Sequence, residues 1–155
     1  MNALIVEDDE NKRIQLESFI RKAFPQAMVS IAKSLQSGLR LILLEKYDYV
    51  ILDMTMPTYD ISVEEDGGRP QAYAGREILR QLDRREIVLP VIVVTQFDRF
   101  GEGKETLTLS ELDAQLRMQH PHIYMGSVYY NPALEGWKQE LSRAIKKIIS
   151  KREGD

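Results

Sequence analysis

Short apolar runs alternate along the chain with longer segments in which apolar residues recur roughly every three to four positions. The short runs are rich in valine and isoleucine, which is typical of strands buried on both faces of a parallel sheet. The longer segments have the period of amphipathic helices. This alternation predicts an α/β fold, a doubly wound parallel sheet with helices on both faces. The predicted strands span about 3–6, 27–31, 48–52, 91–94 and 123–130.

Five helices are predicted between and after these strands. Pro25 ends the first helix, and Ser34 has the features of an N-cap for the second. Glycine and proline mark two long loops, 58–74 and 97–107, which exceed the usual connection of roughly two to six residues and are therefore expected to be functional or mobile. The predicted helices span about 10–24, 35–43, 76–85, 110–119 and 133–151.

Composition narrows the class of protein. The 155 residues are predicted to form one domain, with its core at about 2–150. A net charge of −3 gives no electrostatic reason to expect nucleic-acid binding, and the absence of cysteine excludes disulfides and thiolate chemistry. No apolar run approaches the roughly 18 residues of a membrane span, and the first strand begins too early for a signal peptide. A cytoplasmic protein without a membrane partner is expected.

Acidic and hydroxyl side chains follow three of the apolar runs. Glu7 and Asp8 follow the first run, Asp53 follows the third, and Thr95 ends the fourth. If these strands are parallel neighbours, their carboxyl ends meet at one edge of the sheet, where open α/β sheets bind ligands. Crowded carboxylates repel one another and favour a divalent cation such as Mg²⁺, which leaves coordination positions for a phosphoryl group. An aspartate could then attack phosphorus, and Thr95 could stabilise the phosphoryl oxygens.

In order and spacing these motifs resemble the response-regulator receiver family of two-component signalling. The similarity covers nearly the whole chain and rests on residues 4–9, 47–57, Gly75 and 90–95. It implies a single receiver domain over 1–155 and a flavodoxin-like five-stranded sheet of order 2-1-3-4-5.

The resemblance also implies a role for each site residue. Asp53 would be the phosphate acceptor, and Thr95 the switch hydroxyl that turns toward the phosphate. Asp8 would bind Mg²⁺ directly, Glu7 would bind it through water, and the main-chain carbonyl of Thr55 would complete the metal site with Asp53.

The chain departs from the family pattern in two places. Receivers carry a lysine followed by proline after the fifth strand, and the matching pair here is Asn131-Pro132. Because an amide carries no charge, it would hold a phosphoryl group less strongly, by about 1 kcal/mol or more. Phosphorylation with altered switching, substitution by Lys104, and signalling without phosphate all stay open. The loop 58–74, which starts beside Asp53, is longer than in the family, and as a hypothesis it covers the site or forms a partner surface.

The resemblance implies a stand-alone receiver that is not an enzyme apart from its own phosphorylation and slow autodephosphorylation. Its expected partners are a histidine kinase or phosphotransfer protein, which donates from a phosphohistidine, and a downstream protein target. The expected contact surface is formed by the fourth helix, the fifth strand and the last helix, with Tyr124, Tyr129 and Tyr130.

Two other functions remain as alternatives. A phosphate-independent pseudo-receiver is favoured by the missing lysine and opposed by the retained carboxylates. A small phosphohydrolase with an aspartate nucleophile is suggested by residues 53–55, but that class places its nucleophile on the first strand of its core.

Simpler interpretations apply to several of these residues. The acidic triplet 7–9 could merely cap the first helix, and Asn131 could merely take part in the turn before Pro132. His120 and His122, which flank Pro121, are expected to face solvent rather than to bind zinc.

Overall fold

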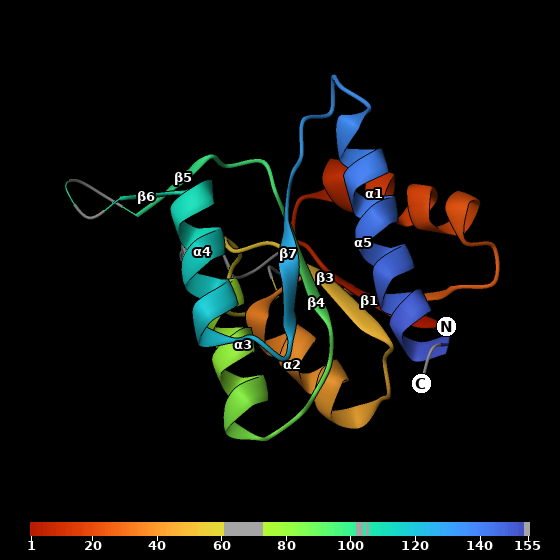
Figure 1. Cartoon of the computed structure of the whole chain (residues 1–155), viewed down its shortest axis with the longest axis horizontal. Helices are drawn as coiled ribbons and strands as arrows, with labels where there is room; N and C mark the ends of the chain where they lie inside the picture. Colours follow the sequence, from red (N-terminus) through yellow and green to blue (C-terminus); the bar gives the residue numbers. More distant parts are fainter. Residues whose placement is uncertain (61–72, 102–103, 105, 154–155) are drawn as a thin grey trace.

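A parallel sheet forms the middle layer of this protein in the computed structural model, which describes residues 1–60, 73–101, 104 and 106–153 (Figure 1). The strand order is β2-β1-β3-β4-β7, and all neighbours are parallel. The doubly wound sheet and the order 2-1-3-4-5 predicted from the sequence are therefore confirmed, with β7 as the fifth strand. Its strands are β1 (Asn2–Val6), β2 (Met28–Ala32), β3 (Tyr49–Leu52), β4 (Val91–Thr95) and β7 (Tyr124–Tyr129).

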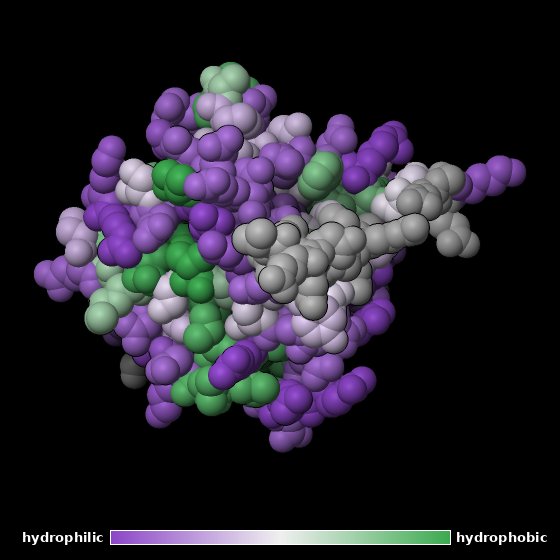
Figure 2. All heavy atoms as spheres, turned by 180° about the vertical axis from the view of Figure 1, so that it is seen from behind, coloured by the Kyte–Doolittle hydropathy of each residue, from purple (hydrophilic) through white to green (hydrophobic). Residues whose placement is uncertain are grey.

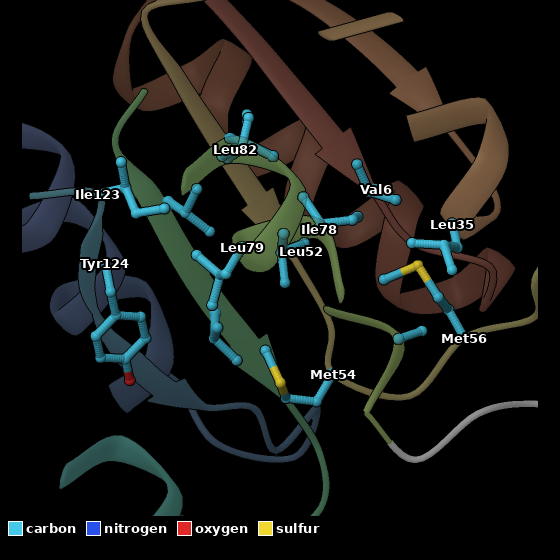
Figure 3. Close-up of a cluster of buried hydrophobic side chains, with 14 of the residues drawn as sticks. Val6, Leu35, Leu52, Met54, Met56, Ile78, Leu79, Leu82, Ile123 and Tyr124 are labelled. Atoms are coloured by element: carbon cyan, nitrogen blue, oxygen red, sulfur yellow. The ribbon is translucent and has the colours of Figure 1, made fainter. Parts of the chain in front are cut away.

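Helices cover both faces of the sheet because the strand side chains point alternately to either face. On one face, Ile5, Ile51 and Val94 pack with apolar residues of α1 (Glu10–Ala23) and α5 (Gly136–Glu153). The opposite face packs against three helices, α2 (Leu35–Leu44), α3 (Ala74–Arg84) and α4 (Leu109–Gln119). Figure 3 shows the core on this second face, where Leu52 of β3 lies beside Ile78 and Leu79 of α3.

Helix ends follow local capping chemistry. Ser34 is the N-cap of α2, as predicted, because its hydroxyl accepts the N–H of Ser37 at 3.2 Å in a capping box. The last helix begins at Gly136, three residues later than predicted. The preceding residues form a turn instead, in which the N–H groups of Ala133 and Leu134 bind oxygens of Asn131.

The segment predicted as a loop at 97–107 contains a short antiparallel hairpin. Its strands are β5 (Arg99–Phe100) and β6 (Leu107–Thr108), and Phe100 is buried in the core beside the Tyr73 ring. Two-residue strands have no recognisable period, so the sequence pattern could not reveal them. Most of the other predicted loop, 58–74, lies outside the described residues.

The two edges of the sheet differ in their surroundings. β7 forms one edge and lies between α4 and α5 in Figure 1. β2 forms the other edge, with Met28 exposed and Val29 and Ile31 half-buried. Seen from behind, the molecule shows an apolar patch bordered by polar side chains (Figure 2).

Within residues 1–60, 73–101 and 106–153, no helix combines the length and apolar character needed to cross a bilayer.

Candidate functional site

The carboxyl ends of β1, β3 and β4 lie side by side. Val6 pairs with Leu52, and Leu52 pairs with Val93, so the residues that follow these strands share one edge of the sheet. Of the sequence-predicted site residues, Glu7, Asp53 and Thr95 are buried there, with exposed fractions of 2%, 3% and 0%. Buried acidic groups require partners, because an unpaired charge is costly to remove from water.

Lys12 is the partner, and sequence reasoning missed it. Its Nζ lies 2.8 Å from Asp53 Oδ2, 2.8 Å from Glu7 Oε2 and 2.6 Å from the main-chain oxygen of Val94. The side chain is only 1% exposed. A signal was present, because Lys12 precedes Leu16 and Ile20 at intervals of four and so continues the buried stripe of α1.

The two oxygens of Asp53 have different partners. Oδ1 accepts the main-chain N–H of Met54 at 2.7 Å, with Thr55 N at 3.5 Å, while Oδ2 accepts from Lys12. The ammonium is stabilised in return. Burial by itself would lower the pKa of Lys12, but the charges of Asp53 and Glu7 outweigh it and raise that pKa above its ordinary value. The neighbouring carboxylates therefore favour the charged form of Lys12.

Glu7 is less fully satisfied than Asp53. Its Oε1 accepts the N–H of Asp9 at 3.1 Å, whereas Oε2 faces Lys12 as an ion pair without hydrogen-bond geometry and accepts no hydrogen bond from the described residues. Burial raises the pKa of Glu7 to about 7, with the charge of Asp53 adding to the rise and Lys12 opposing it.

The substitution Glu7→Gln should therefore change how stability depends on pH. The folded chain holds the Glu7 proton up to about pH 7, whereas the unfolded chain releases it near 4.5, so the free energy of unfolding falls as the pH rises through this window. From pH ~4.5 to pH ~8, the wild type should lose about 2 to 3 kcal/mol relative to the variant. Urea unfolding at both pH values, followed by circular dichroism, measures this, and parallel losses in the two proteins would contradict it.

The three acidic residues after β1 have different roles, because Asp9 caps α1 whereas Glu7 and Asp8 lie at the site. Asp9 is the N-cap of α1, where its carboxylate accepts the N–H of Lys12 at 2.9 Å. The simpler capping interpretation thus holds for Asp9. Asp8 is half-buried, and burial raises its pKa, with the negative charge of Asp53 as a further cause.

Thr95 and Asn131 both bind nearby main-chain groups. Thr95 Oγ1 accepts the N–H of Phe97 at 3.2 Å, and Asn131 Oδ1 accepts the N–H of Ala133 at 3.0 Å. The simpler interpretation of Asn131 as a turn residue therefore describes its geometry. Lys104, which the sequence suggested as a substitute for the missing lysine, is exposed between β5 and β6.

Gly75 allows the start of α3 to close on the turn that carries Asp53. Its N–H donates to the main-chain oxygen of Met54 at 3.0 Å. A Cβ at this position would lie 2.6 Å from Met54 Cε and 2.7 Å from the main-chain oxygen of Asp53. The absence of a side chain is thus a steric requirement of the site.

The site residues were also compared with the needs of a metal ion. Among the residues that the structure describes, no three acidic or histidine side chains gather closely enough to form a ready-made metal site. Mg²⁺ commonly takes only one or two carboxylates, with waters and a phosphate oxygen completing its shell. The donor set of Asp8, Asp53 and the Thr55 carbonyl suits this pattern, and the unsatisfied Oε2 of Glu7 could accept from a metal-bound water.

Two expectations about the surface need correction. Tyr124 and Tyr130 are buried, and of the three tyrosines expected on the contact surface only Tyr129, which is 46% exposed, faces solvent. His120, expected to face solvent, is buried and its Nδ1 binds the Asp83 carboxylate, while His122 is exposed. His120 is the C-cap residue of α4, and its main-chain N–H donates to the carbonyl of Leu116.

Comparison with known proteins identifies the family. The sequence model of the response regulator receiver domain matches residues 3–116, well over half of the chain. The chain belongs to the response regulator receiver domain family. Receiver domains are signalling modules of two-component systems, generally not enzymes.

Relatives of this receiver match along most of their length. It is 36% identical over 146 residues to the uncharacterized protein y4jR of Sinorhizobium fredii, covering 93% of this chain and 96% of that protein. It is 29% identical over 150 residues to the Detocs response regulatory protein DtcB of Enterobacter cloacae, covering 96% and 100%.

A solved receiver shares the fold at lower identity. The receiver domain of the sensor histidine kinase PA1611 from Pseudomonas aeruginosa has a TM-score of 0.57 and 19% identity, covering 96% of this chain and 97% of that one. That structure is described with a magnesium ion coordinated in its active-site cleft.

Proposed function

We propose that this receiver accepts a phosphoryl group on Asp53 from the phosphohistidine of a sensor kinase or phosphotransfer protein, in a Mg²⁺-dependent reaction in the cytoplasm. It then signals by contact with a downstream protein, with no nucleic acid or membrane as partner. The observation that carries the proposal is the environment of Asp53. This buried carboxylate lies at the end of β3, has one oxygen fixed by a main-chain N–H and the other paired with a buried cation.

The chemistry follows from this arrangement. An Asp53 oxygen attacks phosphorus with a lone pair, the phosphorus–nitrogen bond of the phosphohistidine breaks, and its electron pair returns to the imidazole ring. The Met54 N–H holds the carboxylate in one orientation, so little reorganisation is needed. Mg²⁺ held by Asp8, Asp53 and the Thr55 carbonyl, with Glu7 acting through water, would neutralise charge on the phosphoryl oxygens.

Thr95 and water would act after the phosphoryl group has reached Asp53. Thr95, at the end of β4, would turn its hydroxyl from the Phe97 N–H to a phosphoryl oxygen, which couples phosphorylation to the loop after β4. In slow autodephosphorylation, water attacks phosphorus, the bond to Asp53 breaks with its electron pair returning to the carboxylate, and the proton of the water leaves to solvent.

Intact-mass measurement after incubation with Mg²⁺ and acetyl phosphate tests the proposal. The wild type should gain the mass of one phosphoryl group, Asp53→Ala should gain none, and Glu140→Ala, which removes an exposed carboxylate of α5, should behave as the wild type. An unmodified wild type would support the phosphate-independent pseudo-receiver instead. An adduct that survives in Asp53→Ala would place the acceptor elsewhere.

A further inference from the structure

The buried cation of this site comes from an unexpected element. The family pattern places a lysine after the last strand of the sheet, and that position here is Asn131, whose side chain binds the N–H of Ala133. The ammonium beside Asp53 belongs instead to Lys12, the third residue of α1. The positive charge that is missing at position 131 is thus supplied by Lys12.

Lys12 and Tyr130, the residue before Asn131, lie on the same side of the sheet. α1 and α5 cover one face together, and the rings of Phe19 in α1 and Trp137 in α5 lie 5.5 Å apart at a steep angle. Tyr130 immediately precedes Asn131, and its ring centroid lies 5.9 Å from Lys12 Nζ. The ammonium therefore reaches the neighbourhood of the β7–α5 junction, where a side chain from position 131 would otherwise supply it.

We propose that Lys12 is the phosphoryl-binding cation of this receiver, replacing the lysine that the family carries after its last strand. This inference rests on the proposed phosphorylation of Asp53. A lysine ammonium has three N–H donors. Two of them bind Asp53 Oδ2 and the Val94 carbonyl, and the third faces Glu7 as an ion pair without hydrogen-bond geometry.

Phosphorylation of Asp53 would redirect these donors. A phosphoryl group presents more negative charge and more acceptor oxygens than the carboxylate it modifies. Lys12 would then donate to a phosphoryl oxygen and remain protonated throughout, so that no proton is transferred at this step. Because Lys12 also binds the carbonyl next to Thr95, the cation and the switch hydroxyl would respond to the same group.

The variants Lys12→Met and Asn131→Lys separate this role from a merely structural one. With Mg²⁺ and acetyl phosphate, Lys12→Met should acquire the phosphoryl mass about tenfold to hundredfold more slowly than the wild type. The double variant, Lys12→Met with Asn131→Lys, should recover most of the rate, because the ammonium returns from the position that the family uses. A slow double variant that is folded by circular dichroism would overturn the proposal, since charge at the site would then not be what was lost.

Asn131→Lys alone provides a test that leaves Lys12 in place. If Lys12 already supplies the cation, the added lysine should change the phosphorylation rate by less than about threefold. A phosphorylation rate that rises tenfold or more in Asn131→Lys would show that the wild type lacks an effective phosphoryl-binding cation, and it would overturn the proposal. So would wild-type rates in Lys12→Met. Failure of the wild type itself to take up a phosphoryl group would instead refute the proposed function, which keeps the two failures distinct.

Discussion

Replacing Lys12 by methionine is expected to lower the free energy of unfolding by about 3 kcal/mol at neutral pH in the absence of divalent ions. Methionine keeps a long unbranched side chain, one atom shorter than that of lysine, and removes the charge together with the N–H donors that bind Asp53 and the Val94 carbonyl. Glu7 and Asp53 would then face each other in a site where both are at most 3% exposed, without the ammonium that lies 2.8 Å from each. Breaking a buried ion pair from one side leaves an uncompensated charge, which costs far more than losing a surface pair.

Urea unfolding followed by circular dichroism would measure this loss, with Lys147→Met as the matched control. Lys147 is exposed on α5, so its replacement should change stability by less than about 0.5 kcal/mol. Adding Glu7→Gln to Lys12→Met should restore part of the stability, because only one of the two carboxylates then remains. Equal stability of Lys12→Met and the wild type would show that solvent reaches these carboxylates. It would contradict the burial of Glu7 and Asp53 around Lys12.

Gly75→Ala is expected to destabilise the protein by about 3 kcal/mol or more and to reduce phosphorylation of Asp53 as well. The added methyl group would meet the Met54 side chain, which can move, but also the main-chain oxygen of Asp53 at 2.7 Å, which cannot move without shifting the site. The added Cβ would also lie 2.7 Å from Leu52 Cδ1, and Figure 3 shows Leu52 beside Ile78 and Leu79 of α3. The start of α3 would therefore be pushed from the turn that orients the acceptor.

Gly136→Ala is the matched control for this prediction. Gly136 begins α5, and a Cβ there would meet nothing within 4 Å, so the substitution should be neutral or slightly stabilising. The two variants are compared by urea unfolding and by phosphoryl uptake in the presence of Mg²⁺. If Gly75→Ala unfolded at the same urea concentration as Gly136→Ala, the steric requirement at Gly75 would be wrong.

The sheet could be predicted from the sequence because each central strand is a short run of apolar residues that only a buried environment explains. Val50, Ile51 and Leu52 are at most 1% exposed, as such a run requires. The hairpin of β5 and β6 could not be predicted, because pairs of residues such as Arg99 and Phe100 carry no periodic signal. The prediction for His120 was wrong for a related reason, since its side-chain partner, Asp83, lies 37 residues away in the sequence.

Part of the site could also be predicted, because some of its residues follow local sequence patterns. Carboxylates at strand ends are visible as local patterns, and the topology that brings Glu7 and Asp53 together follows from the parallel order. Their roles as metal ligands and phosphate acceptor stay predictions. Lys12 was overlooked because a single lysine in a helix is usually solvated, and its pairing depends on side chains that are 41 residues apart in the chain. A charged residue on an otherwise apolar helical stripe was the available clue.

Two neighbouring rings, tilted by 56° to each other, connect the buried ammonium to the only indole in the sequence. Lys12 Nζ lies over the Tyr130 ring, and that ring lies 5.0 Å from the ring of Trp137. Because indole emission responds to nearby charge and to the packing of its neighbours, displacement of Lys12 would be transmitted to the fluorophore through a single intervening residue. The protein thus contains an intrinsic optical reporter of its acidic site, with no label to introduce and no second tryptophan to confuse the signal.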